Sequence, residues 1–241
     1  MTRFTIVPDA EDVCRTTADR FVELASEAIE ERGIFRVALS GGSTPKRVYP
    51  LLLEPQRRDA VDWSRVEFFW GDERAVPPDH PESNFGVAWS AFISQLPGVR
   101  QDRVHRMPAE ADDLDGAAIG YETELRLAFD ARGDEPPVFD LVWLGMGPDG
   151  HTASLFPGST ALEEDERWVV ATWAPALETW RMTLTLPVIN AARMVILGVF
   201  GANKAEAIRR IRAGSSDLPA SRVAGGQVEW IVDAAAVGAA A

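Results

Sequence analysis

The sequence contains few cysteines and histidines, the residues that form disulfides and the commonest transition-metal sites. Its 241 residues include one cysteine, Cys14, and three histidines, His80, His105 and His151. One cysteine forms neither an internal disulfide nor a CxxC-type metal cluster, and the histidines stand in unrelated segments without HExxH spacing. We therefore expect no metal, and we interpret Cys14 as a small packing residue.

The sequence also lacks long apolar runs and an excess of basic charge. No stretch approaches the ~20 apolar residues of a membrane span, and the first residues lack the apolar core of a signal peptide. The formal net charge of −13 repels the polyanionic surfaces of nucleic acids and membranes. We predict a soluble, cytoplasmic protein with no nucleic-acid and no membrane partner. An anionic small substrate would need a pocket that is locally positive.

Apolar runs of strand length alternate with amphipathic helical segments along the chain. With 46% hydrophobic residues, the chain can form one sizeable core. The alternation predicts an α/β fold with a mostly parallel sheet and helices on both faces, in a single domain over 1–241. The expected strands are 4–7, 35–39, 66–70, 103–107, 141–144, 168–173, 181–186, 194–200 and 228–232, the last of which closes the sheet. The expected helices are 9–32, one that starts near residue 45, 84–96, 110–132 and 205–213.

A glycine-rich turn follows the strand 35–39. Gly41 and Gly42 permit a tight turn, Ser43 or Thr44 can cap a helix, and Pro45 suits the first helical position. A helix that starts there directs free N–H groups at the space above the strand, which suits an anion. An ordinary capped turn is the alternative. Lys46 favours the anion site, because the chain has only two lysines and the other, Lys204, follows a similar turn after strand 194–200.

The segment 140–159 is the one around which the rest of the chain is organised. The buried strand 141–144 opens into a loop with Gly145, Gly147 and Gly150, which also carries the polar residues Asp149, His151 and Ser154. An imidazole can accept a proton near neutral pH, and a glycine-rich loop could bring the carboxylate of Asp149 close enough to fix its tautomer. A Ser154–His151 nucleophile is the alternative, but the GxSxG pattern is absent.

Other polar residues follow other strands. Asp72 and Arg74 come directly after strand 66–70, where ligands bind in α/β proteins, although an ion pair of Arg74 with its acidic neighbours is a simpler interpretation. Because parallel strands end at one edge of the sheet, we expect Ser43, Arg74, His151 and Lys204 to meet there. We interpret His80 as a loop-surface residue and His105 as a structural one.

Five motifs, in this order along the chain, are similar to those of a known family, and the resemblance spans the chain from about residue 10 to residue 233. They resemble the 6-phosphogluconolactonases, within the superfamily that includes glucosamine-6-phosphate deaminase. The motifs are LSGGSTP (39–45), GDERAVPPDHPESN (71–84), GMGPDGHTASLFPG (145–158), RMTLTLPVIN (181–190) and GANKAEAI (201–208).

This resemblance implies a Rossmann-like fold and a reaction. Members of the family hydrolyse 6-phospho-D-glucono-1,5-lactone to 6-phosphogluconate in the oxidative pentose phosphate pathway, without an organic cofactor, and are often monomers. It implies that His151 is the general base, with Asp149 beside it. The residues implied to face the phosphorylated sugar are Gly41, Gly42, Ser43, Arg74, Arg181 and Lys204.

A deaminase or an aldose-ketose isomerase of the same superfamily is the nearest rival. The deaminase branch can be compared residue by residue. It shares Asp72 and the histidine of the DGH motif, but it carries a glutamate for ring opening where this chain has Phe156, and usually a tyrosine where this chain has Arg74. Both departures favour the lactonase. In this chain Asp72 would orient Arg74 or a substrate hydroxyl. A non-catalytic sugar-phosphate sensor is a third possibility, disfavoured by the acidic charge, the intact His151 and the lack of a helix-turn-helix extension.

Overall fold

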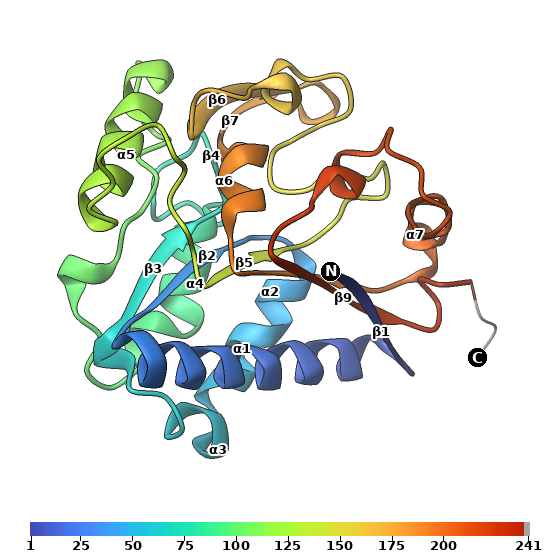
Figure 1. Cartoon of the computed structure of the whole chain (residues 1–241), viewed down its shortest axis with the longest axis horizontal. Coiled ribbons are helices and arrows are strands. Elements are labelled where there is room, and N and C mark those ends of the chain that lie inside the picture. The colour runs from blue at the N-terminus through green and yellow to red at the C-terminus, as the bar shows by residue number, and fades with distance from the viewer. Residues whose placement is uncertain (239–241) are drawn as a thin grey trace.

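A computed structural model describes residues 1–238, and its centre is a parallel sheet (Figure 1). The order of its strands explains why residues distant in sequence meet at one edge. From one side to the other the strands are β1 (Thr2–Val7), β9 (Gln227–Asp233), β8 (Met194–Val199), β5 (Leu141–Leu144), β2 (Phe35–Leu39) and β3 (Val66–Trp70).

Helices cover both faces of this sheet, as predicted. α1, α2 and α4 lie along one face, and α6 lies on the other (Figure 1). The helices are α1 (Ala10–Arg32), α2 (Ser43–Val48), α3 (Pro55–Arg58), α4 (Asn84–Ala91), α5 (Leu114–Ala128), α6 (Leu186–Ala191) and α7 (Ala205–Arg212). Short 3-10 turns are η1 (Tyr49–Leu53), η2 (Trp63–Arg65), η3 (Ile93–Gln95), η4 (Gln101–Arg103), η5 (Thr160–Glu163), η6 (Pro175–Leu177), η7 (Ala202–Lys204) and η8 (Pro219–Arg222).

A second, antiparallel sheet lies beside the first, and the sequence did not predict its separation. Its strands, in order, are β4 (Asp72–Arg74), β7 (Thr179–Leu184) and β6 (Val169–Ala174). Gly71 joins the two sheets: its N–H donates to the Leu39 carbonyl at 2.7 Å, and its carbonyl accepts from the Leu184 N–H at 2.8 Å. The chain therefore leaves the parallel sheet one residue before Asp72, which turns β4 toward the sheet edge.

Several expected elements are wrong in extent or place. The expected strand 103–107 is reduced to one bridge between Val104 and Phe68, because the 3-10 turn η4 takes up its first residue, Arg103. The helix expected over 110–132 is shorter and comprises only α5. The helix expected over 84–96 ends with α4, and the 3-10 turn η3 follows it. The last strand does not close the sheet, because β9 pairs with β8 on one side and with β1 on the other.

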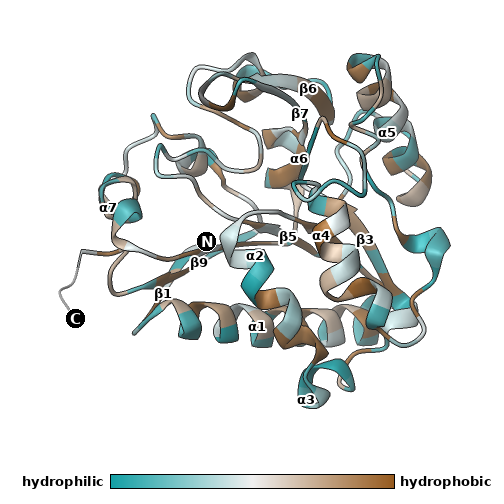
Figure 2. Cartoon of the chain, turned by 180° about the vertical axis from the view of Figure 1, so that it is seen from behind, coloured by the Kyte–Doolittle hydropathy of each residue, from teal (hydrophilic) through white to brown (hydrophobic). Residues whose placement is uncertain are grey.

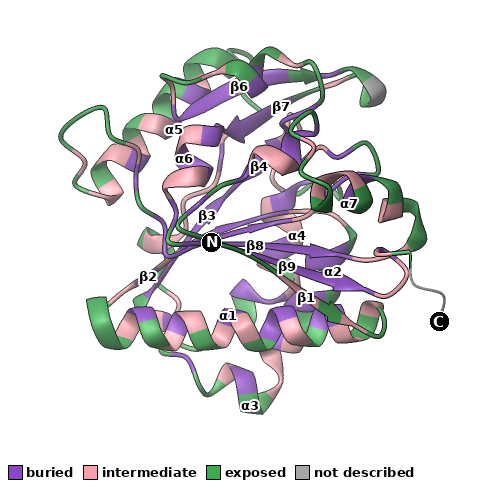
Figure 3. Ribbon diagram, turned by 45° about the vertical axis from the view of Figure 1, so that its right-hand side comes forward, coloured by how far each residue is buried: buried purple, intermediate pink, exposed green. Residues whose placement is uncertain are grey.

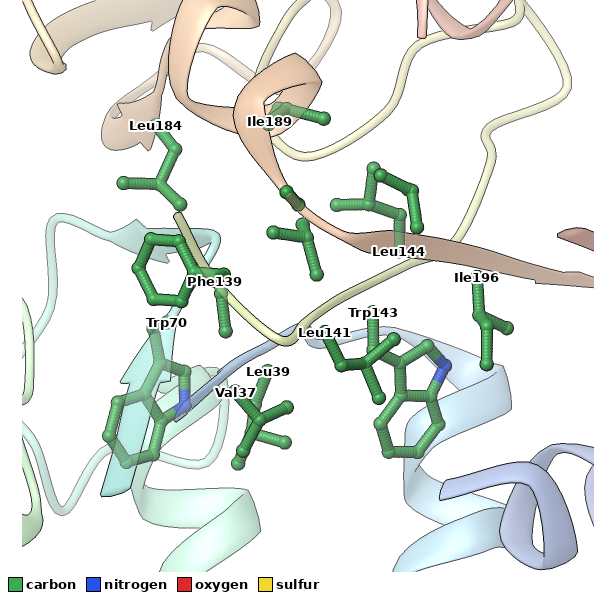
Figure 4. Close-up of a cluster of buried hydrophobic side chains, with 14 of the residues drawn as sticks. Val37, Leu39, Trp70, Phe139, Leu141, Trp143, Leu144, Leu184, Ile189 and Ile196 are labelled. Atoms are coloured by element: carbon green, nitrogen blue, oxygen red, sulfur yellow. The ribbon is translucent and has the colours of Figure 1, made fainter. Parts of the chain in front are cut away.

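The core sits on both sides of the central strand β5. Its residues are all buried, as are those of its neighbour β8 (Figure 3). Figure 4 shows Trp143 directed to one side of the sheet and Leu144 to the other. Trp143 packs against Phe21 of α1. Hydrophilic and hydrophobic residues alternate along the length of α1 (Figure 2). A fully apolar strand is required at this place, since it is covered from both faces. Within 1–238, no helix is both long and apolar enough to cross a membrane.

Candidate active site

A cavity of about 260 Å³ opens at the carboxyl edge of the parallel sheet. It brings together Ser43, Arg74, His151 and Lys204, which the predicted topology placed at one edge. The lining residues come from the segments after β2, β5 and β8 and from β4. They are Ser40, Gly41, Gly42, Ser43, Thr44, Pro45, Asp72, Arg74, Gly145, Met146, Gly147, Pro148, His151, Thr152, Ala153 and Lys204.

His151 and Asp149 are in direct contact in the loop after β5. Nδ1 of His151 lies 2.6 Å from Oδ1 of Asp149, and the His151 N–H donates to the same oxygen at 3.2 Å. The loop closes through the Gly147 N–H, which donates to the His151 carbonyl at 2.8 Å, and through Gly150 with φ +81°. A carboxylate oxygen accepts, so Nδ1 carries the proton of a neutral imidazole and Nε2 is left as the acceptor.

Asp72 is fixed by two side chains that sequence reasoning did not assign to the site. It is 6% exposed, Oδ1 accepts from Nδ2 of Asn84 at 3.1 Å, and Oδ2 accepts from Oγ of Ser154 at 2.6 Å. The Ser154 hydroxyl is thus directed at Asp72 and not at His151, which removes the alternative of a Ser–His nucleophile. The Arg74 guanidinium donates through Nη1 to the Glu82 carbonyl.

Glu73 holds the start of α4, and with it Asn84. Its carboxylate accepts from the backbone N–H groups of Asn84 at 2.7 Å and Phe85 at 2.8 Å, and from Oγ of Ser83 at 3.0 Å. Burial raises the pKa of Glu73, and the backbone N–H donors oppose that rise. Ser83 caps the helix, because its hydroxyl accepts from the Gly86 N–H, and α4 begins at Asn84 as predicted.

Arg74 and Arg181 lie opposite each other on the antiparallel strands β4 and β7. Arg74 lines the cavity, whereas Arg181 is not among the lining residues. Arg181 is 8% exposed, and its Nε has no hydrogen-bond partner in the part of the chain that the structure describes. Burial, followed by the charge of Arg74, lowers the pKa of Arg181. Two guanidinium groups side by side make this edge of the cavity locally positive.

The two lysines have different surroundings. Lys204, at the end of η7, lines the cavity, and burial lowers the pKa of its ammonium while the charge of Asp149 opposes the shift. Lys46 is exposed and does not line the cavity. The inference that both lysines stand beside anion sites is therefore wrong for Lys46, because the helical turn of α2 places it beyond the edge of the site.

The helix after β2 begins earlier than predicted, and it has a different cap. Gly42 is the N-cap, with φ +96°, and no side chain caps the helix, so neither Ser43 nor Thr44 has the expected capping role. The hydroxyl of Thr44 instead donates to the Gly198 carbonyl at 3.1 Å, which ties α2 to β8. Gly41 is required for space, since a Cβ atom there would collide with the amide of Asn84.

The residues interpreted as structural lie outside the cavity. His105 bridges Glu124 at 2.6 Å and Glu67 at 3.1 Å, His80 is an exposed loop residue, and Cys14 is 2% exposed in the core. Among the residues that the structure describes, no group of three histidine, cysteine, aspartate or glutamate side chains could hold a metal ion.

Known proteins and one family model are similar to this chain over most of its length. The family model described as glucosamine-6-phosphate isomerases/6-phosphogluconolactonase matches residues 8–232. A protein named 6-phosphogluconolactonase from Synechocystis is 40% identical, over 92% of this chain and 88% of its own length. One of the same name from Nostoc is 37% identical, over 96% of this chain and 95% of its own. The solved structure titled 6-phosphogluconolactonase from Trypanosoma cruzi superposes with a TM-score of 0.87 at 32% identity, over 99% of this chain and 96% of that one.

Proposed function

Since the chain belongs to the family of glucosamine-6-phosphate isomerases and 6-phosphogluconolactonases, we propose that it is a lactone hydrolase, a 6-phosphogluconolactonase. Its substrate would be 6-phospho-D-glucono-1,5-lactone and its product 6-phospho-D-gluconate, in the oxidative pentose phosphate pathway. The observation that carries the proposal is the contact of Asp149 with Nδ1 of His151 in a cavity that also holds Arg74 and Lys204.

His151 would act first as a base and then as an acid. Its Nε2 takes a proton from water while the water oxygen attacks the lactone carbonyl, and the carbonyl oxygen gains negative charge. When that tetrahedral species collapses, the bond from the carbonyl carbon to the ring oxygen breaks. The imidazolium then returns its proton to the departing ring oxygen. Asp149 holds Nδ1–H throughout, which stabilises the imidazolium and keeps Nε2 directed into the cavity.

The phosphate would be bound by positive charge at the same edge. Lys204 and Arg74 line the cavity, and Gly41, Gly42 and Ser43 form the turn where the N–H groups of α2 begin. Charge-assisted hydrogen bonds from such groups are the strong ones for phosphate, and they offset the repulsion from a chain of net charge −13. Because the phosphate is remote from the reacting carbonyl, this binding positions the substrate.

The experiment that tests the function compares wild-type protein, His151→Ala and His80→Ala on freshly generated lactone, with correction for spontaneous hydrolysis. We expect His151→Ala to lower kcat by about 10²- to 10⁴-fold, the usual contribution of a general base. His80 is an exposed histidine outside the cavity, so His80→Ala should retain wild-type turnover. Binding of 6-phosphogluconate should survive in both variants.

Two outcomes would contradict the proposal. A folded wild-type protein that does not hydrolyse the lactone would refute the activity, and an active His151→Ala would refute the role of His151. Glucosamine 6-phosphate belongs in the same assay, because turnover of it would identify a deaminase. We expect none, since Phe156 stands where that branch has a proton-transferring glutamate and a phenyl ring transfers no proton.

A further inference from the structure

A buried aromatic ring lies against the imidazole of His151. The ring centroids of Phe156 and His151 are 4.6 Å apart, with 40° between the ring planes. Phe156 is 6% exposed, whereas the side chain of His151 is 27% exposed. One side of the imidazole is therefore covered by a buried side chain.

A tight turn between the two residues makes this contact possible. Thr152 and Leu155 form an antiparallel bridge, in which the Leu155 N–H donates to the Thr152 carbonyl at 2.9 Å. Ala153, inside the turn, has φ +47°, a left-handed conformation that a residue with a Cβ atom seldom adopts. The chain thus reverses within four residues, and Phe156 reaches back over His151.

The turn is attached to three neighbouring strands. The Thr152 hydroxyl donates to the Gly145 carbonyl at 2.8 Å, next to the end of β5. The Ser154 hydroxyl donates to Asp72 of β4, and the Ser154 N–H donates to Oγ1 of Thr183 in β7 at 3.3 Å. Backbone strain persists only where the surrounding structure determines the conformation, and strained residues of this kind cluster at functional sites.

One edge of the ring is occupied as well. Asp149 contacts Nδ1, and a Cβ atom on Gly147 would collide with Nδ1 and Cε1, so the backbone of Gly147 lies along that edge. Within residues 1–238, Nε2 has no hydrogen-bond partner. The ring is thus in contact with Phe156 on one side and with Asp149 and Gly147 along its Nδ1–Cε1 edge.

From this arrangement, we propose that Phe156 is a positioning residue for His151. It restricts rotation of the imidazole, so that Nδ1 stays on Asp149 and Nε2 stays directed at the reacting carbonyl. The catalytic part of this proposal rests on the proposed lactonase function, whereas the geometric part does not. A small displacement of the imidazole lowers the rate of the chemical step, because the reacting atoms are no longer aligned. It leaves binding of the substrate phosphate unchanged.

The test replaces the ring by a flexible apolar side chain. We expect Phe156→Leu to lower kcat for the lactone about tenfold, a partial loss of general-base catalysis, while KM and the affinity for 6-phosphogluconate change less than about twofold. Phe4→Leu is the matched control, because Phe4 stacks on Trp230 at the far edge of the sheet and does not line the cavity. If Phe156→Leu does not fold, Phe156→Met keeps the buried volume and serves in its place.

A second readout does not depend on activity. The protein has three histidines, so the ¹⁵N spectrum of its imidazoles is simple and His151→Ala assigns the signals of His151. In wild type we expect one protonated nitrogen and one unprotonated nitrogen for neutral His151. In Phe156→Leu we expect both signals to move toward averaged values, because a ring that leaves Asp149 populates both neutral tautomers, which interconvert by proton exchange with water.

These outcomes separate the two proposals. Unchanged kcat in Phe156→Leu, a loss of kcat that is matched by an equal loss of product affinity, or an unchanged His151 spectrum would each overturn the role of Phe156. Absence of turnover by the wild type would instead refute the lactonase function, and the spectra would still decide whether Phe156 holds the ring.

Discussion

Nearly all of the positively charged residues of the chain are arginines, and its two lysines lie in different environments. Lys204 is partly enclosed at the cavity, while Lys46 extends into solvent four residues after the Gly42 cap. A compact ammonium with three rotatable donors suits a phosphate, whose geometry it does not need to match. The two lysines therefore form a natural pair for mutation.

Replacing Lys204 should weaken substrate capture, and the same change at Lys46 should not. A hydrogen bond to a charged group contributes ~1.5–3 kcal/mol, so Lys204→Met should lower kcat/KM by about tenfold to a hundredfold. Lys46→Met should stay within twofold of wild type. Steady-state kinetics on the lactone measure both, and equal losses in the two variants would show that net charge matters and not the place of Lys204.

The pH dependence of binding gives a second check on Lys204. Burial lowers the pKa of its ammonium, so on raising the pH the cation is lost earlier than for an ordinary lysine. Affinity for 6-phosphogluconate should therefore fall on the alkaline side in wild type, and Lys204→Met should lack this dependence.

At the scale of elements, one buried histidine joins β3 to α5 away from the cavity. Burial of the His105 ring opposes its charge, but hydrogen bonds to Glu124 and Glu67 outweigh that effect and raise the pKa of His105 to about 9. Glu67 belongs to β3, Glu124 belongs to α5, and the His105 ring stacks on Phe69 at 4.4 Å. The segment 103–107, which the sequence predicted as a strand, is thus attached to β3 and α5 through the side chain of His105.

The contribution of His105 to stability should depend on pH with a definite sign. Its folded pKa of about 9 exceeds the ordinary value of 6.5, so the contribution is complete below about pH 6.5 and is lost as the pH rises through 9. Since Glu124 is 44% exposed and solvent screens that pair, we expect a loss of only about 1–2 kcal/mol.

Urea unfolding between pH 6 and pH 10 measures the effect. His105→Gln should show a smaller decrease in the free energy of unfolding over this range than wild type. The exposed His80 gives the control, His80→Gln, which should follow the wild-type curve. Parallel curves for wild type and His105→Gln would mean that this histidine does not carry the dependence.

At the scale of the molecule, two sheets share one core and one cavity. Gly71 passes directly from β3 to β4, and Leu184 of β7 packs in the same core cluster as Trp143 of β5. The chain is therefore expected to unfold as one domain over 1–241, although residues 239–241 lie outside the described part. We predict a monomer, which the resemblance to the lactonases implies.

Two probes of unfolding should give the same transition. Buried tryptophans occur in the parallel sheet (Trp143 and Trp230) and just before β6 (Trp168), so fluorescence reports on both sheets. Its thermal midpoint should coincide with that of far-UV circular dichroism. Light scattering should give the mass of one chain. Two separated transitions would contradict the single domain, and a concentration-dependent mass would contradict the monomer.

The sequence alone determined the parallel sheet and most of the cavity, because these depend on local order. Apolar runs such as 141–144 require a covered strand, and parallel strands end at one edge, so Ser43, Arg74, His151 and Lys204 had to converge. The short loop between Asp149 and His151 likewise limits their separation. Each of these predictions depends either on residues that are close in sequence or on the direction in which a strand runs, and both can be read from the sequence.

Only the tertiary structure decided which side chains hold the reactive ones in place. Ser154 lies 82 residues from Asp72, and Asn84 lies 12 residues from it, so no local pattern indicates that both bind its carboxylate. The register of β4 on β7, which sets Arg74 beside Arg181, and the turn that brings Phe156 onto His151 also depend on long-range packing. The sequence thus supplied the reactive groups and their edge of the sheet, whereas contacts between distant segments determined their orientation.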